Sequence, residues 1–242
     1  MLISDVIHLY NKASTIDAAI ASVVAQSWSE WKLIVVDDGS RDDGPDLVSQ
    51  WAHRDRRIRL VKQANSGVSA ARNHGVALSD SEYVAFLDAD DFWLPEHLKN
   101  LVALLEVAPN AVMWAAAYRL VDDIGNDRTV LLQPETAGDL GYYLIHDYFA
   151  EAVHREFPVH SSAVMARKSA LHEIGGFPLG VRSGEDVLTW ARLSCLGPFP
   201  ISRSATAVYA APPISPGRRR EVVRRPATPC PVLQGLDDLV QH

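Results

Sequence analysis

The sequence predicts an α/β fold, with a mostly parallel central sheet flanked by helices and a smaller region beside it. Two observations point to this class. Short apolar runs, typical of parallel strands buried on both faces, alternate with amphipathic helical patterns through the first half of the chain. Apolar residues make up 48% of the 242 residues, so a sizeable core can form. Together these features imply a layered α/β architecture.

The first half of the chain is expected to contain four strands, each followed by a helix, and a fifth strand at residues 111–120. The second strand is almost continuously apolar and stops at a turn-forming segment that begins with Asp37 and Asp38. In the first helix Ile16, Ile20 and Val23 share one face. The expected strands are residues 3–9, 32–36, 58–62 and 83–87, and the expected helices are residues 14–27, 45–53, 66–78 and 95–106.

The second half of the chain is less regular. Residues 121–158 have weak periodicity, whereas residues 161–166 resemble a strand and residues 168–174 a short helix closed by two glycines. Another helix is expected to begin at Gly184-Glu185-Asp186 and to end near Cys195. Residues 212–231 contain six prolines and five arginines, a composition that predicts irregular structure.

Composition and charge exclude several classes of protein. The formal net charge of −7 argues against nonspecific nucleic-acid binding, which favours basic proteins. The two cysteines, Cys195 and Cys230, form no CxxC or Cys/His motif, so neither a disulfide framework nor a zinc site is expected. The first residues lack a signal-peptide pattern, and no apolar run reaches the roughly 20 residues that span a bilayer. A cytoplasmic protein is therefore expected.

Three acidic sites stand out because two of them follow buried strands. Asp37 and Asp38 end one strand, residues 88–91 (DADD) end another, and Glu185-Asp186 begin a helix much later. Ligands of open α/β sheets bind beyond the carboxyl ends of strands. The two acidic sites at strand ends are therefore candidates for such a ligand-binding crevice.

Asp88 and Asp90 are candidate metal ligands. They are two residues apart on extended backbone, so their side chains can point the same way. Carboxylate oxygens suit Mg²⁺ or Mn²⁺, and such an ion can bridge to a diphosphate. The alternative is a solvated Asp-rich turn that precedes the helix after Pro95.

Six blocks of sequence resemble, in order, those of family 2 glycosyltransferases. Each block alone is a weak motif, but six in the family's order are highly specific, and the resemblance covers about residues 3–210. The blocks are VIHLYNK (6–12), LIVVDDGS (33–40), NSGVSAARN (65–73), YVAFLDADD (83–91), GGF (175–177) and GED (184–186) with Trp190 and Arg192.

The resemblance implies a GT-A fold with a Rossmann-like sheet, a nucleotide-diphospho-sugar donor, expected to be a UDP-sugar, and transfer with inversion. It implies that Tyr10 and Asp38 line the nucleoside pocket, with Asp38 holding the base, and that Arg72 lies near the nucleotide. In the DxD-like pair, Asp90 is the expected ligand of Mn²⁺ or Mg²⁺ and Asp88 lies nearer the ribose. The simpler interpretations are that Tyr10 is a core aromatic, Asp38 a turn residue and Arg72 a surface arginine.

Asp186 matches the family's catalytic base, with Glu185 as the second candidate. An acceptor hydroxyl must lose a proton as it attacks the anomeric carbon, and a carboxylate can accept that proton. The alternative, which is compatible with this role, is that both acids simply favour a helix N-terminus.

The sequence departs from the family at two places. His8 stands where proline or a small residue is usual, and it is expected either to contact the nucleotide or to pack. After Tyr209 many members have an arginine and a nearby histidine, whereas this chain has Ala210-Ala211-Pro212. A C-terminal metal ligand is therefore in doubt, and neither His160 nor His172 matches that sequence position.

The expected organisation is a nucleotide-sugar-binding half at residues 1–120, an acceptor-binding half at 121–211 and a Pro/Arg-rich tail at 212–242. The expected partners are a nucleotide-sugar donor, no nucleic acid, and a glycan or lipid-linked acceptor, as in polysaccharide biosynthesis. A peripheral membrane contact through the tail arginines is a further hypothesis.

Two rival functions are a non-catalytic nucleotide-sugar-binding module and a sugar nucleotidyltransferase, although the glycine-rich loop of the latter is missing after the first strand. The absence of GxGxxG excludes a dinucleotide-binding protein.

Overall fold

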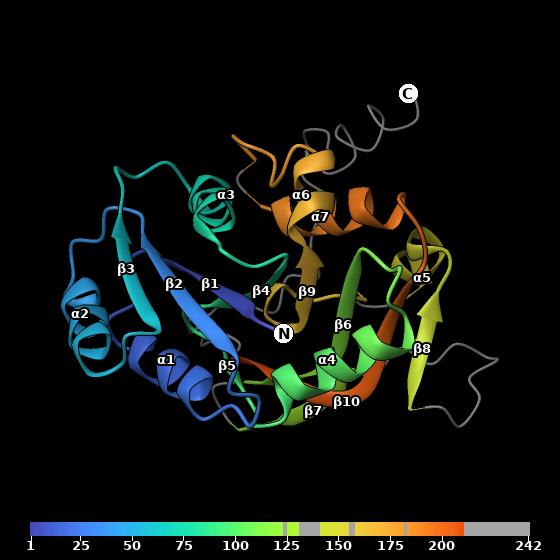
Figure 1. Cartoon of the computed structure of the whole chain (residues 1–242), viewed down its shortest axis with the longest axis horizontal. Helices are drawn as coiled ribbons and strands as arrows, with labels where there is room; N and C mark the ends of the chain where they lie inside the picture. The colour runs from blue at the N-terminus through green and yellow to red at the C-terminus, as the bar shows by residue number, and fades with distance from the viewer. Residues whose placement is uncertain (123–124, 131–140, 155–157, 182, 211–242) are drawn as a thin grey trace, which may run out of the picture.

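The computed structural model of the chain describes residues 1–122, 125–130, 141–154, 158–181 and 183–210. These residues form three layers, a central sheet between two groups of helices (Figure 1). The sheet order is β3-β2-β1-β4-β9-β6-β10-β5, with β7 paired to β6 and β8 paired to β10. The strands are β1 (Ile3–Leu9), β2 (Trp31–Asp37), β3 (Ile58–Lys62), β4 (Tyr83–Asp88), β5 (Phe92–Trp93), β6 (Met113–Val121), β7 (Asp127–Val130), β8 (Tyr142–Ile145), β9 (Val164–Arg167) and β10 (Phe199–Ala210).

Helices cover both faces of the sheet (Figure 1). One core cluster joins the sheet to α1, α2 and α4, and another joins it to α5, α6 and α7. Helix α3 lies on the same face as α6 and α7 (Figure 1). The helices are α1 (Ile16–Val24), α2 (Gly44–Arg54), α3 (Val68–Leu78), α4 (His97–Val107), α5 (Tyr148–His154), α6 (Lys168–Glu173) and α7 (Glu185–Ser194), and a short 3₁₀ turn, η1 (Ser161–Ala163), precedes β9.

The α/β prediction is confirmed, and the parallel part of the sheet lies where it was expected. Strands β3, β2, β1 and β4 pair in parallel. Beyond β4 the direction changes, because β9 runs antiparallel to both β4 and β6. The amino end of β9 therefore lies at the same edge of the sheet as the carboxyl end of β4, and this reversal determines which residues reach the site.

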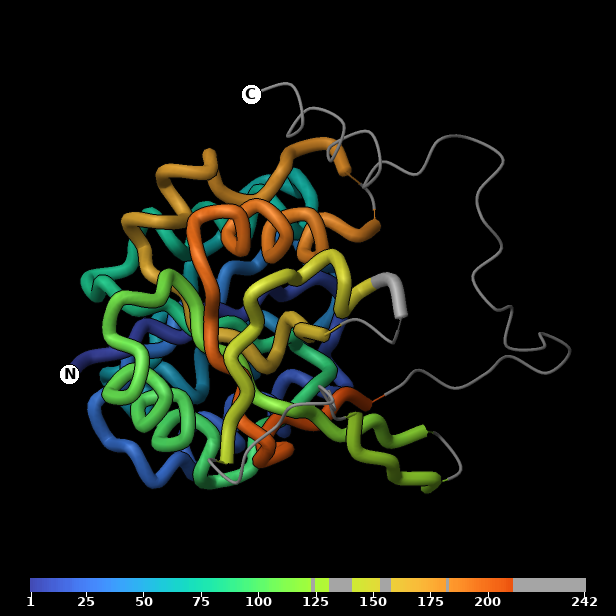
Figure 2. Tube along the Cα trace, turned by 90° about the vertical axis from the view of Figure 1, so that its right-hand side faces the viewer, coloured from blue at the N-terminus to red at the C-terminus, as the bar shows by residue number. Residues whose placement is uncertain are grey.

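Four strands and one helix were not anticipated from the sequence: β5, β7, β8, α5 and β10. Strand β10 crosses the second half of the sheet and pairs with β6, β8 and β5, with a register shift between Ser202 and Ala207. Figure 2 shows the hairpin of β6 and β7 extending from the side of the body. No helix among the described residues is long and apolar enough to cross a bilayer.

A glycine in α3 sets the distance between this helix and the sheet. A Cβ atom at Gly75 would lie 2.4 Å from Cγ1 of Val6 in β1, so only glycine allows the observed approach. Arg72 lies almost one helical turn earlier in α3, and its guanidinium reaches the end of β4. The close helix–strand contact thus brings a buried cation to the sheet edge.

The core also contains an ionisable group without a partner. Asp5, in the middle of β1, is fully buried between its neighbours Leu33 and Ala85 in the adjacent strands. Neither carboxylate oxygen has a hydrogen-bond partner among the described residues. Burial raises the pKa of Asp5 well above its ordinary value, because the charged form cannot be solvated there.

Candidate functional site

An open pocket of about 220 Å³ lies at the carboxyl ends of β1 and β4, between these strands, the start of α3 and the start of α7. This is where an open α/β sheet is expected to bind ligands. The pocket brings together several residues predicted from the sequence: Tyr10, Arg72, Asp88 and Asp90, expected near the nucleotide sugar and metal, and Glu185, the second candidate base. Its lining residues are His8, Tyr10, Lys12, Val68, Arg72, Asp88, Ala89, Asp90 and Glu185.

The three aspartates at the end of β4 and directly after it bind different partners. Asp88 accepts a hydrogen bond of 2.6 Å from Arg72, and Asp90 forms a hydrogen-bonded ion pair with Lys12. Asp91 is buried and accepts hydrogen bonds from the hydroxyl of Ser162 and the backbone N–H of Ala210. Burial and the charge of Asp88 raise the pKa of Asp91 well above its ordinary value.

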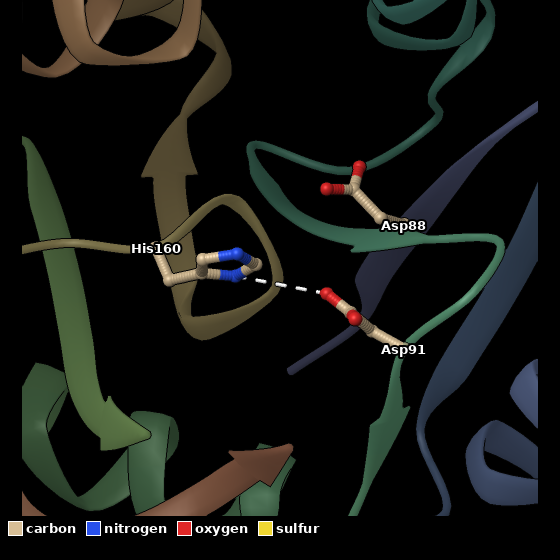
Figure 3. A group of neighbouring side chains, drawn as sticks. All are labelled: Asp88, Asp91 and His160. Carbon is tan, nitrogen blue, oxygen red and sulfur yellow. Dashed lines mark ion pairs between the residues drawn. The ribbon is translucent and has the colours of Figure 1, made fainter. Parts of the chain in front are cut away.

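Asp88 and Asp91 converge with His160 (Figure 3). One ligand atom from each of the three residues lies within 4.8 Å of the others. Two carboxylates and an imidazole form a donor set that suits a divalent cation such as Mn²⁺. Burial lowers the pKa of His160, so its imidazole is neutral near pH 7, which is the form that ligates metals. These residues therefore fit a divalent metal, and the group includes Asp88 of the predicted pair but not Asp90.

His160 reaches this group because β9 runs antiparallel to β4. The residue directly precedes η1 and β9, so its segment begins at the edge where β4 ends. Its ring packs against Tyr118 and Tyr209, with centroids 5.2 and 4.7 Å away. His160 is thus in contact with Tyr209 in space, although the two residues are far apart in sequence. The sequence predicted a mostly parallel sheet, in which the segment before β9 would lie at the opposite edge. His160 was therefore not expected at this site, because the antiparallel direction of β9 was not known.

Arg72 links the two sides of the pocket. Its guanidinium donates to Asp88 at 2.6 Å and to Glu185 at 3.0 Å, and its side chain is only 4% exposed. Burial alone would raise the pKa of Asp88, but the charge and the hydrogen bond of Arg72 outweigh it and lower that pKa. For Glu185 burial prevails over Arg72, and the pKa is raised. Arg72 is therefore buried and paired, unlike the surface arginine of the simpler interpretation.

Asp186 lies beside the same cluster, at the start of α7. Its Oδ2 accepts a hydrogen bond of 2.8 Å from the hydroxyl of Ser161, the residue after His160. The hydroxyl of Tyr148 is buried and has no hydrogen-bond partner among the described residues. Burial and the charge of Asp186 raise the pKa of Tyr148. Asp186 thus lies near the group formed by Asp88, Asp91 and His160, here called the metal-type group, and the hydroxyl of Ser161 binds one of its carboxylate oxygens.

Asp38 and His8 form a separate contact at the ends of β2 and β1. The carboxylate of Asp38 is 1% exposed and accepts hydrogen bonds from the side chain of Gln63 and the backbone N–H groups of Ser66 and Gly67. It thereby fastens the loop before α3, and it does not line the pocket. His8 Nε2 lies 3.7 Å from Asp38 Oδ2, and burial lowers the pKa of His8. Tyr10, in contrast, is exposed on the pocket wall.

Solved structures with the same arrangement are glycosyltransferases of the GT-A fold. Residues 1–349 of Staphylococcus aureus TarS in complex with UDP-GlcNAc match 88% of this chain and 59% of that chain, with a TM-score of 0.70 and 20% identity. The mannosyltransferase PcManGT of Pyrobaculum calidifontis, in complex with GDP-Man and Mn²⁺, matches 87% of this chain and 57% of that chain, with a TM-score of 0.63 and 18% identity. At these identities the likeness establishes the fold, which is GT-A as the sequence predicted.

Sequence comparison identifies the family. An uncharacterized glycosyltransferase of Nostoc sp. is 39% identical over 131 residues, which are 54% of this chain and 40% of the relative. The chain spans about a quarter to two fifths of the length of the curated relatives it matches first. The model of glycosyl transferase family 2 matches residues 4–174, well over half of the chain. The protein therefore belongs to glycosyl transferase family 2.

Proposed function

We propose that the protein transfers a sugar from a nucleotide-diphospho-sugar, with a UDP-sugar as the preferred donor, to an acceptor hydroxyl with inversion. The observation that carries this proposal is the convergence of Asp88, Asp91 and His160 at the sheet edge, where Asp88 lines the pocket and Asp186 binds Ser161, the residue next to His160. The UDP and UDP-GlcNAc complexes of TarS support the choice of nucleotide.

The donor is proposed to lie along residues 1–120 and the acceptor against residues 121–211. The acceptor oxygen attacks the anomeric carbon, the bond from that carbon to the diphosphate oxygen breaks, and the nucleoside diphosphate leaves with the electron pair. The hydroxyl proton moves to the carboxylate of Asp186, whose other oxygen is held by Ser161. Direct displacement of this kind inverts the anomeric configuration.

We further propose that Asp88, Asp91 and His160 hold a divalent metal, with Asp90 as an additional ligand. When bound, such an ion would neutralise charge on the departing diphosphate. The charges in the pocket support this role. Asp88, Asp90 and Glu185 line it against two cations, Lys12 and Arg72, which are already paired with these carboxylates. An anionic diphosphate therefore needs further positive charge.

Metal dependence is the first test of this function. UDP is expected to bind roughly tenfold more tightly in Mn²⁺ than in EDTA when measured by calorimetry, a typical strength for coupling between two ligands. His160→Ala and Asp90→Ala are each expected to reduce that difference. His172→Ala is the matched control, because His172 is an exposed histidine in α6.

Equal UDP affinity in Mn²⁺ and EDTA would remove the metal from the proposal. An unchanged difference in His160→Ala would remove His160 alone. Release of UDP from a UDP-sugar, followed in the same samples, separates an enzyme from a nucleotide-sugar-binding module, because the module binds the donor without consuming it.

The acceptor is proposed to be a glycan or a lipid-linked sugar. Arg218, Arg219, Arg220, Arg224 and Arg225 lie in the tail beyond the described residues and were predicted to contact a membrane. Each basic residue near an anionic bilayer contributes about 1 kcal/mol. The protein is expected to co-sediment with phosphatidylserine liposomes at low salt and to be released at high salt, and replacing the five arginines by glutamine should abolish this. Equal sedimentation with neutral liposomes would exclude the tail contact.

A further inference from the structure

Lys12 and Arg72 both line the pocket, but they differ in their freedom to move. The side chain of Arg72 is 4% exposed and is held by the carboxylates of Asp88 and Glu185, which both line the pocket. The side chain of Lys12 is 42% exposed, and its ammonium pairs with Asp90, which is itself 32% exposed. Of these two cations, Lys12 is the one that can change partner without disturbing the core.

The main chain at Lys12 is held in place, so a change of partner involves its side chain. The carbonyl of Lys12 accepts hydrogen bonds from the N–H groups of Thr15 and Ile16 at 3.1 and 3.0 Å. Asn11 has a positive φ of 52° and accepts a hydrogen bond from the N–H of Arg41. The turn between β1 and α1 therefore presents the lysine side chain to the pocket from a fixed point.

Asp90 faces the metal-type group as well as Lys12. It lines the same pocket as Asp88, one of the three residues of that group, and it is separated from Asp88 and Asp91 by at most two positions in the chain. In the structure, however, Asp90 is outside the set of ligand atoms formed by Asp88, Asp91 and His160, and its Oδ2 is bound to Lys12. One carboxylate of the pocket is thus paired with an internal ammonium and lies close in the chain to two residues of the group that fits a divalent cation.

We propose that Lys12 is a diphosphate ligand that holds Asp90 until the donor binds. When the nucleotide sugar and the metal enter, the ammonium moves from Asp90 to the diphosphate oxygens and Asp90 joins the metal. This inference rests on the proposed function. In this proposal the turn after β1 presents Lys12 so that its ammonium can be replaced on Asp90 by the metal ion that enters with the donor.

The relative strengths of the contacts favour this exchange. A half-exposed lysine–carboxylate pair is weak, because water solvates both charges well when they separate. A hydrogen bond from an ammonium to a phosphate oxygen is charge-assisted and short, and the diphosphate presents several such oxygens. Releasing Asp90 also adds a carboxylate to the divalent ion, for which oxygen ligands are suited.

Lys12→Met tests the exchange with two calorimetric titrations, since methionine keeps most of the side chain and removes the charge. Mn²⁺ without nucleotide is expected to bind roughly two- to fivefold more tightly to Lys12→Met, because Asp90 is no longer occupied. UDP in EDTA is expected to bind about tenfold more weakly. Lys32→Met is the matched control, because Lys32 forms an exposed pair with Asp80 away from the pocket. Lys12→Arg should retain UDP binding.

The opposite signs of the two effects identify the exchange. Weaker UDP binding without tighter Mn²⁺ binding would overturn it, because Lys12 would then not compete with the metal for Asp90. Identical behaviour of Lys12→Met and Lys32→Met, with metal-dependent UDP binding intact in the unmodified protein, would overturn this inference and leave the proposed function standing. Absence of UDP binding by the unmodified protein would overturn both.

Discussion

Asp186→Asn is expected to slow sugar transfer by about 10²–10⁴-fold, the usual contribution of a general base, and to leave nucleotide affinity nearly unchanged. The amide cannot accept the acceptor's proton, yet its oxygen can still accept the hydrogen bond from Ser161. Asp186 is also outside the pocket-lining residues, so the donor should bind normally. Steady-state transfer rates and calorimetric UDP affinities, measured on the same preparations, provide the test.

Asp46→Asn is the matched control for this prediction. Asp46 is an exposed aspartate in the first turn of α2, so it undergoes the same chemical change at a comparable helix position but remote from the pocket. A wild-type rate in Asp186→Asn would reassign the base, with Glu185 as the next candidate. A loss of nucleotide binding together with activity would instead indicate a donor-binding or structural role for Asp186.

Asp5→Val is expected to raise the free energy of unfolding at pH 7 by roughly 2–4 kcal/mol. The fully buried carboxylate makes no hydrogen bond among the described residues, and valine removes the unpartnered polar group and buries apolar surface instead. Urea unfolding at pH 7 measures the difference. Asp5→Asn is the control, because it has nearly the same shape and cannot ionise but keeps a buried polar group.

The same substitution should alter the pH dependence of stability. The pKa of Asp5 is raised in the folded state above its ordinary value of 3.8, so the folded protein binds this proton more tightly than the unfolded chain. The contribution of the protonated Asp5 to the free energy of unfolding is therefore fully present below pH 3.8. It is lost as the pH rises from 3.8 through the raised pKa of the folded state. Both Asp5→Val and Asp5→Asn should remove this component. A destabilised Asp5→Val protein, or an unchanged slope in both variants, would contradict the assignment.

The elements predicted correctly from the sequence are those with a local signal. Residues 3–9 and 58–62 match β1 and β3 without adjustment. Strand β1 is buried along nearly its whole length, as expected of a strand inside a parallel sheet, whereas β3 is an edge strand in which only Ile58 is buried. Strand β10 gave no such signal. Its polar residues, including Arg203 and Thr206, interrupt the pattern, and its structure depends on pairing with β6, β8 and β5, which lie far away in the sequence.

The site was predictable where one segment supplies several polar groups. The DADD segment and the pair Glu185-Asp186 were visible as motifs, whereas the link between them through Arg72 depends on how closely α3 packs on β1. His160 could not be assigned because the direction of β9 is set by tertiary pairing. Asp5 escaped notice for a similar reason, since one acid in an apolar run does not reveal which face it occupies.

The bridge made by Arg72 limits how this fold can be recombined. Residues 1–120 contribute Arg72 and Asp88, and the later part of the chain contributes Glu185. A chimera that joins this amino-terminal half to the second half of another family member would have to keep a carboxylate at position 185. Without it, a buried guanidinium would lose one of its two counter-charges, a defect that costs about 3–5 kcal/mol when a buried pair is broken on one side. The second half of the chain can therefore be exchanged between relatives only together with this one acidic residue.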